Sequence, residues 1–173
     1  MRRRLRGGER AERPSTGARA RLRRCRAIAA SLELPVPFDA FELIAAAAEQ
    51  RGRPIELMPM PWAPGVPCGL LVSAGQADYI AYAADTSVLH RQHILVHELS
   101  HLLCGHEGTL SAELTPHLAS DLVHRVLGRT VYAEPQEQEA ELLASLIIQR
   151  AVWTGPEQPP DPFLGPAPGR GRP

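Results

Sequence analysis

The segment with the clearest chemical potential is residues 90–106, HRQHILVHELSHLLCGH. His97 and His101 stand four residues apart in it, and Glu98 follows the first of them directly. Residues four apart lie one turn above each other on the same face of an α-helix, so two imidazoles at this spacing can bind one zinc ion. Glu98 lies about 100° around such a helix from His97, within reach of a water on the metal. The spacing therefore predicts a zinc site with a general base beside it.

This chemistry is that of peptide hydrolysis. Zinc lowers the pKa of a bound water to about 7 and polarises a carbonyl, and Glu98 would take the proton and return it to the leaving amine. The alternative interpretation is a solvated polar stripe on an amphipathic helix. It is disfavoured because the neighbouring residues are apolar, and burying two imidazoles and a carboxylate among them is costly without a metal or hydrogen-bond partners.

A catalytic zinc needs a third protein ligand and one open position. Residues 134–145, EPQEQEAELLAS, offer three candidates: Glu137, Glu139 and Glu141. On a helix Glu137 and Glu141 share a face while Glu139 lies on another, so the three cannot all reach one ion. Spacing alone does not choose among them. The glutamates that bind no metal are expected to be solvated acids, which the helix dipole favours in a first turn.

The motif HELxHLxxGH, followed some tens of residues later by E-x-EA-x-x-x-A, resembles the ImmA/IrrE family of metallo-endopeptidases. The resemblance spans roughly residues 38–150 and includes the preceding layout of helix, strand and hairpin. Ser100 stands where the family often has glycine, and His93 where it often has phenylalanine. The first 35 residues and the C-terminal tail have no part in it.

The resemblance implies a ligand set. His97 and His101 would bind zinc, Glu98 would be the catalytic base, and Glu139, the glutamate directly before an alanine, would be the third ligand. The other two glutamates of that segment remain alternatives. The resemblance also implies an endopeptidase with a narrow, regulatory protein substrate, typically a helix-turn-helix transcriptional repressor.

A catalytically silent binding module, comparable to one half of a toxin–antitoxin pair, is the alternative function. Such a protein would keep the zinc site and act by holding a partner. The intact Glu98 favours the enzyme, because a structural zinc site needs no base and usually fills its fourth position with a protein ligand.

Other residues near the motif have several interpretations. His93 is expected to pack or to face the substrate cleft, His106 to cap the helix C-terminus or line the cleft, and Cys104 to be a small buried hydrophobe. Three residues are candidates to hydrogen-bond the oxyanion of the transition state, and nothing in the sequence selects one: Tyr132, His117 and His124.

The elements that must position these residues follow from periodicity and from turn and cap residues. Helices are predicted at 18–32, 39–52, 87–104, 114–127 and 134–153, and strands at 54–60, 68–73 and 78–83. The predicted fold is α+β and zincin-like, with a small antiparallel sheet packed against helices and the H-E-x-x-H motif on a central helix. The strand 78–83 is expected to present its edge over the cleft, where a peptide could pair with it.

The composition fits one globular domain with two tails, since the chain has 173 residues and 44% are hydrophobic. Residues 1–17 are predicted to be a disordered basic arm, residues 18–153 the metallopeptidase domain, and residues 154–173 a flexible tail rich in proline and glycine. Residues 1–26 contain 11 of the 19 basic residues of the chain. Without interleaved aromatic residues, this is weak evidence for nucleic-acid binding.

The three cysteines form no C-x-x-C pair, which argues against a disulfide framework and against a thiolate zinc site. The basic N-terminus is not followed by an apolar segment of the kind that a signal peptide has, and no apolar stretch is long enough to span a bilayer. A cytoplasmic protein without a membrane partner is therefore expected.

Overall fold

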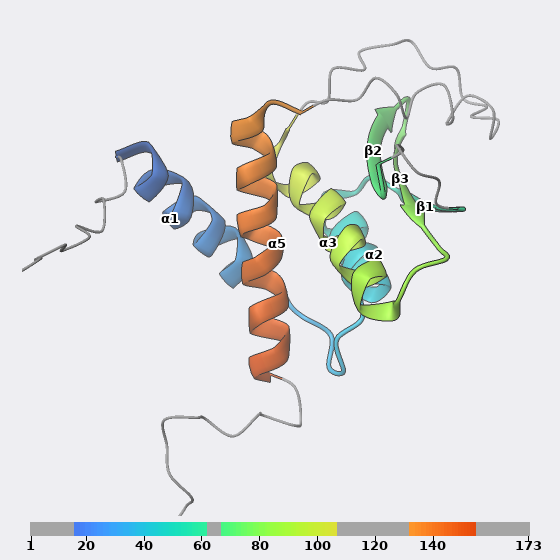
Figure 1. Cartoon of the computed structure of the whole chain (residues 1–173), viewed down its shortest axis with the longest axis horizontal. Coiled ribbons are helices and arrows are strands. Elements are labelled where there is room, and N and C mark those ends of the chain that lie inside the picture. The colour runs from blue at the N-terminus through green and yellow to red at the C-terminus, as the bar shows by residue number, and fades with distance from the viewer. Residues whose placement is uncertain (1–15, 62–66, 107–131, 155–173) are drawn as a thin grey trace, which may run out of the picture.

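The computed structural model describes residues 16–61, 67–106 and 132–154 (Figure 1). Its elements are α1 (Thr16–Ser31), α2 (Ala40–Arg51), β1 (Ile55–Met60), β2 (Gly69–Ala74), β3 (Ala77–Ala83), α3 (Val88–Cys104) and α5 (Glu134–Thr154). The predicted α+β class is confirmed. The helix α1 begins at Thr16, two residues before its predicted start at 18, and the helix predicted at 114–127 lies outside the described residues. Within the described part, no helix combines the length and hydrophobicity that a membrane span requires.

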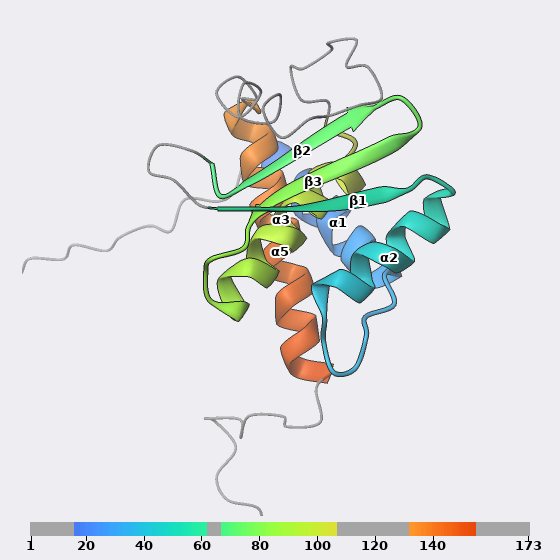
Figure 2. The same ribbon diagram turned by 90° about the vertical axis from the view of Figure 1, so that its right-hand side faces the viewer.

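The sheet has the strand order β1-β3-β2 and is mixed (Figure 2). The strands β2 and β3 form an antiparallel hairpin whose turn contains Gly75 at a φ of 53°. The strand β1 pairs in parallel with the other edge of β3. The prediction of an antiparallel sheet is thus wrong for β1. The reason is that the hairpin turn dictates only how β2 meets β3, whereas the place of β1 depends on a longer connection that the sequence pattern does not constrain.

The strand β3 lies in the middle of the sheet and is covered on both faces. Ile80 and Tyr82 belong to the main core with the helices, while Ala81 packs with Leu70 and Val72 in a smaller cluster on the opposite face. The expectation that strand 78–83 presents a free edge is therefore wrong. The edge strand on the side of the hairpin is β2.

The helix α3 is central, between the sheet and α5 (Figures 1 and 2). Its fully buried Leu95 and Leu99 meet Leu143 and Ile147 of α5 in the main core. The helix α1 packs against α5. The motif-bearing helix is thereby held on two sides by apolar contacts, which stabilise the fold mainly by removing nonpolar surface from water.

The ends of the motif-bearing helix are set by a cap residue on each side, close to the predicted range 87–104. The side chain of Ser87 accepts a hydrogen bond from the backbone N–H of His90, at 3.2 Å. At the other end Gly105 adopts the left-handed conformation with a φ of 68°, which ends a helix without the steric cost that a Cβ would bring. These two caps fix which residues of the segment are helical.

Candidate metal centre

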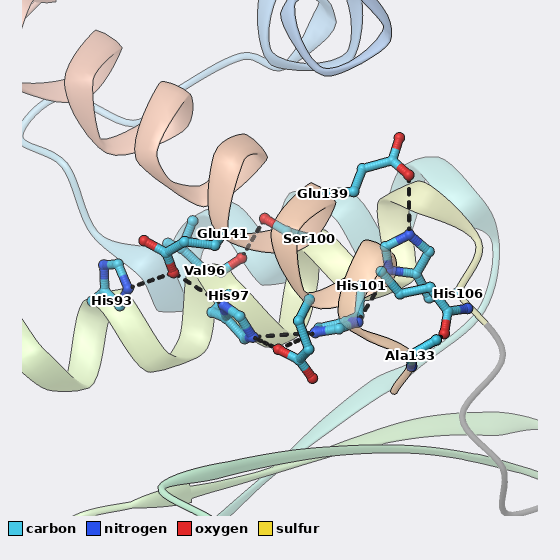
Figure 3. Close-up of polar contacts among 11 residues, drawn as sticks. His93, Val96, His97, Ser100, His101, His106, Ala133, Glu139 and Glu141 are labelled. Atoms are coloured by element: carbon cyan, nitrogen blue, oxygen red, sulfur yellow. Dashed lines mark hydrogen bonds and ion pairs between the residues drawn. The ribbon is translucent and has the colours of Figure 1, made fainter. Parts of the chain in front are cut away.

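His97 and His101 lie one above the other on α3, and we refer to them as the imidazole pair (Figure 3). Their Nε2 atoms are 3.1 Å apart, as expected from the four-residue spacing. The side chain of His101 is only 1% exposed, whereas that of His97 is 21% exposed. Burial, together with the neighbouring imidazoles of His97 and His106, lowers the pKa of His101 to about 3. His101 is therefore a neutral imidazole, the form that can bind a metal ion.

Glu137 is the acidic residue that meets the imidazole pair. Its Oε2 atom lies 3.3 Å from Nε2 of His97 and 3.7 Å from Nε2 of His101. One donor atom from each of the three residues falls within 4.8 Å of the other two. His97, His101 and Glu137 thus form a group that could hold a metal ion.

The structure does not bring Glu139, the third ligand implied by the family resemblance, to the imidazole pair. Its carboxylate instead lies 3.4 Å from Nε2 of His106 and 3.3 Å from Nη1 of Arg24. Two residues correspond to about 200° around a helix, so Glu139 and Glu137 leave α5 on nearly opposite sides. Glu137, one of the two glutamates that remained as alternatives, thus lies where the resemblance would place Glu139.

Glu141 shares a face with Glu137 but lies one turn further along α5. Its Oε2 atom is 3.4 Å from Nδ1 of His97 and 3.3 Å from Nε2 of His93 (Figure 3). It therefore contacts the ring nitrogen of His97 that faces away from the metal-binding group. His93 contacts Glu141 and lines the pocket beside the metal-binding group, in agreement with the expectation that it faces the cleft.

Glu98 lies beside the imidazole pair and is largely buried, with 7% of its surface exposed. Burial and the nearby charge of Glu137 raise its pKa to about 8, against the opposing effect of a hydrogen bond from the backbone of Leu71. The close approach of β2 causes this burial. A Cβ atom on Gly69 would collide with the Glu98 side chain and come within 2.8 Å of Ile94. Gly69 is a site residue that the sequence analysis missed, although a glycine at the start of a strand is a known signal of close approach.

A pocket opens between the N-terminal part of β2 and the two helices α3 and α5. Its lining combines the metal-binding group and Glu98 with residues from the sheet side: Pro67, Cys68, Gly69, Leu70, His93, Ile94, His97, Glu98, His101, Tyr132 and Glu137. The pocket therefore gives a ligand access to the imidazoles and to the Glu98 carboxylate at the same time. The edge strand β2 forms one of its walls.

Tyr132 is the one residue of the three oxyanion-binding candidates that the structure describes, since His117 and His124 lie outside the described residues. Its ring stacks on His101 with the centroids 3.7 Å apart. Its hydroxyl is buried and has no hydrogen-bond partner within the described ranges. Burial raises the pKa of this phenol, which keeps it protonated as a hydrogen-bond donor.

His106 and Cys104 form a second group with Glu139 behind His101. Nδ1 of His106 lies 3.1 Å from Nδ1 of His101, and its backbone N–H donates to the His101 carbonyl. Burial raises the pKa of the Cys104 thiol to about 12, so the thiol is protonated and behaves as the small buried hydrophobe that was expected. The sequence analysis did not foresee that α1 reaches this group through Arg24.

Comparison with protein-family models, with curated proteins and with solved structures finds no match for this chain. The resemblance to the ImmA/IrrE family therefore depends on the sequence pattern alone and remains a prediction.

Proposed function

We propose that this chain is a zinc-dependent endopeptidase that uses His97, His101 and Glu137 as metal ligands and Glu98 as catalytic base. One observation carries the proposal: two imidazoles, a carboxylate ligand and a separate buried carboxylate face one open pocket. A purely structural zinc site has no need of the second carboxylate. The H-E-x-x-H motif lies on the central helix α3, as in a zincin.

The separations within the ligand group support zinc. A tetrahedral zinc ion with bonds of about 2.05 Å requires donor atoms about 3.3 Å apart. The three separations among the Nε2 atoms of the imidazole pair and Oε2 of Glu137 are 3.1, 3.3 and 3.7 Å. Two histidines and one glutamate form the ligand set of several catalytic zinc sites, which leave one position for solvent or substrate.

In the proposed reaction, bound zinc supplies a Lewis acid that activates water and polarises the scissile carbonyl. Glu98 accepts the proton of the attacking water and delivers it to the leaving amine. Its place in the lining of the same pocket as the ligands supports this role. Tyr132 lines the same pocket, and its hydroxyl has no hydrogen-bond partner among the described residues, so it is the candidate donor to the oxyanion.

A protein substrate would bind as an extended segment against the edge of β2. An edge strand offers unpaired backbone groups to a peptide, and β2 forms a wall of the pocket. The strand β2 thus takes the role of pairing with the substrate, which was first expected of the strand 78–83. The family resemblance implies that the substrate is a helix-turn-helix repressor, so the protein encoded by the neighbouring gene is the first candidate to test.

The test compares the purified wild type with Glu98→Gln, a variant that keeps the ligands and the shape of the pocket. Zinc content is measured by elemental analysis, and each protein is incubated with the neighbouring gene product. We expect about one zinc per chain in both proteins and cleavage by the wild type alone. Zinc in both with cleavage by neither would instead indicate the silent binding module, and a wild type that binds no zinc contradicts the proposal.

A further inference from the structure

The side of His101 that faces away from the pocket is joined to α1 by three polar side chains. We propose that Arg24, Glu139 and His106 form a positioning chain that fixes the ring of His101 for zinc binding. The proposal builds on the zinc site of the proposed function. It gives the N-terminal helix, which has no part in the family resemblance, a role in the metal centre.

The contacts are continuous. Nδ1 of His101 lies 3.1 Å from Nδ1 of His106, whose Nε2 lies 3.4 Å from Oε2 of Glu139. The other carboxylate oxygen of Glu139 is 3.3 Å from Nη1 of Arg24. The second guanidinium nitrogen of Arg24 donates to the carbonyl of Cys104 at 2.6 Å, so the chain ends on the same helix that carries the imidazole pair.

One arrangement of protons gives every hydrogen bond of the positioning chain both a donor and an acceptor. When Nε2 of His101 binds a metal ion, its Nδ1 carries the proton and donates to Nδ1 of His106. Nε2 of His106 then carries a proton and donates to the Glu139 carboxylate. A histidine ligand held in this way has one tautomer and one ring orientation, and a carboxylate behind it increases its basicity.

The burial of each member of the positioning chain indicates how strongly it should affect the metal site. The side chain of His106 is 6% exposed and that of Glu139 is 14% exposed, so their hydrogen bonds are largely shielded from water. The side chain of Arg24 is 53% exposed, and solvent screens its charge. Loss of Glu139 should therefore weaken the metal site more than loss of Arg24.

A second cation bound by Cys104, His106 and Glu139 is the competing interpretation, because one donor atom of each lies within 4.8 Å of the others. Two observations oppose it. The Arg24 guanidinium already places a positive charge on Glu139. Burial, moreover, raises the pKa of the Cys104 thiol to about 12, which disfavours the thiolate that a metal ligand requires.

The experiment measures zinc affinity by competition with a chelator, in the full chain. We expect Glu139→Gln to bind zinc about tenfold more weakly than the wild type. Arg24→Ala should bind it about two- to threefold more weakly. Two matched controls should bind zinc as the wild type does: Glu134→Gln removes a carboxylate from the same helix, and Arg23→Ala removes an exposed arginine next to Arg24.

A spectroscopic readout separates positioning from a general loss of stability. The visible absorption of the cobalt-substituted protein reports the geometry of the ligands, and we expect it to change in Glu139→Gln but not in Glu134→Gln. Should Glu139→Gln fail to fold, the exposed Arg24 still provides the test through Arg24→Ala.

Three outcomes would overturn the positioning chain. Wild-type affinity and an unchanged cobalt spectrum in Glu139→Gln would contradict it, while leaving the endopeptidase proposal intact. A second equivalent of zinc in the wild type that is lost in Cys104→Ala would show that Cys104, His106 and Glu139 bind a metal ion instead. A wild type that binds no zinc would refute both proposals together.

Discussion

Asp78 and Glu98 are two buried carboxylates in one small fold, and their surroundings are opposite. Asp78 is 1% exposed and pairs with Arg51 at 2.6 Å and Arg53 at 3.0 Å. Glu98 is nearly as buried but, among the described residues, forms an ion pair with none of the arginines. Burial raises the pKa of both carboxyls, and this effect is reversed only at Asp78, where hydrogen bonds from Arg51, Ser73 and Arg53 lower the pKa.

The difference separates a carboxylate that stabilises the fold from one that is available for chemistry. Asp78 ties β3 to α2 and to the start of β1, and its charge is neutralised inside the protein. Glu98 carries the cost of burial without an internal cation and faces a pocket, which is the pattern of a functional group. Substitution of each carboxylate by its amide therefore tests the comparison directly.

The largest expected effect is the loss of hydrolysis in Glu98→Gln. Removal of the general base should lower kcat by about 10³-fold. The free energy of unfolding of the metal-free protein should not fall, because burial raises the pKa of the Glu98 carboxyl and such a group destabilises the fold at neutral pH. Peptide-bond cleavage and urea unfolding of the same preparation measure the two quantities. A lower free energy of unfolding in Glu98→Gln would contradict the contrast with Asp78, since it would mean that the Glu98 carboxylate also stabilises the fold.

Gly69→Ala should produce the next largest effect, about a 10²-fold loss of kcat. The added Cβ occupies the space of the Glu98 side chain and must push it from its place. The three metal ligands are not in that contact, so zinc affinity should stay within about twofold of the wild type. Chelator competition and kinetics on one protein sample distinguish these outcomes. Wild-type activity would show that the close approach of β2 does not position the base.

Asp78→Asn should reduce the stability of the protein without affecting the metal centre. Breaking a fully buried ion pair costs several kcal/mol, but Arg51 and Arg53 are partly exposed and can turn to solvent. We therefore expect a loss of about 2 kcal/mol in the free energy of unfolding. Urea unfolding measures this loss, and zinc affinity serves as the internal control. A weakened zinc site in a folded Asp78→Asn protein would contradict the division between the two carboxylates.

Local spacing was sufficient to find the imidazole pair and Glu98, because helix geometry alone places residues four apart on one face. It was also sufficient for the bounds of α2 and α3, because the preferences of the residues that begin and end a helix act within one turn. Both α2 and α3 therefore end where the sequence predicts.

Features that depend on packing between distant segments were not accessible in this way. The choice of Glu137 over Glu139 depends on which side of α5 faces α3, and both sides carry glutamates. The parallel pairing of β1 and the contact of Arg24 with Glu139 likewise join segments whose patterns are independent of each other. Asp78 looked like an ordinary residue at the start of a strand, since nothing local predicts that two arginines surround it.

The smallest expected effect is the acid sensitivity that Asp78 contributes. Its pKa in the folded protein lies below the ordinary value of 3.8, so its ion pairs stabilise the fold at higher pH and are lost as the pH falls through the folded pKa. The difference in unfolding free energy between the wild type and Asp78→Asn should thus be constant above about pH 5 and shrink below about pH 4. Urea unfolding of both metal-free proteins between these values and about pH 3 measures it, and the titration of all other groups cancels in the difference. A difference that grows with acidity would mean that the charged form of Asp78 is not the stabilising one, and the contrast with Glu98 would then have no electrostatic basis.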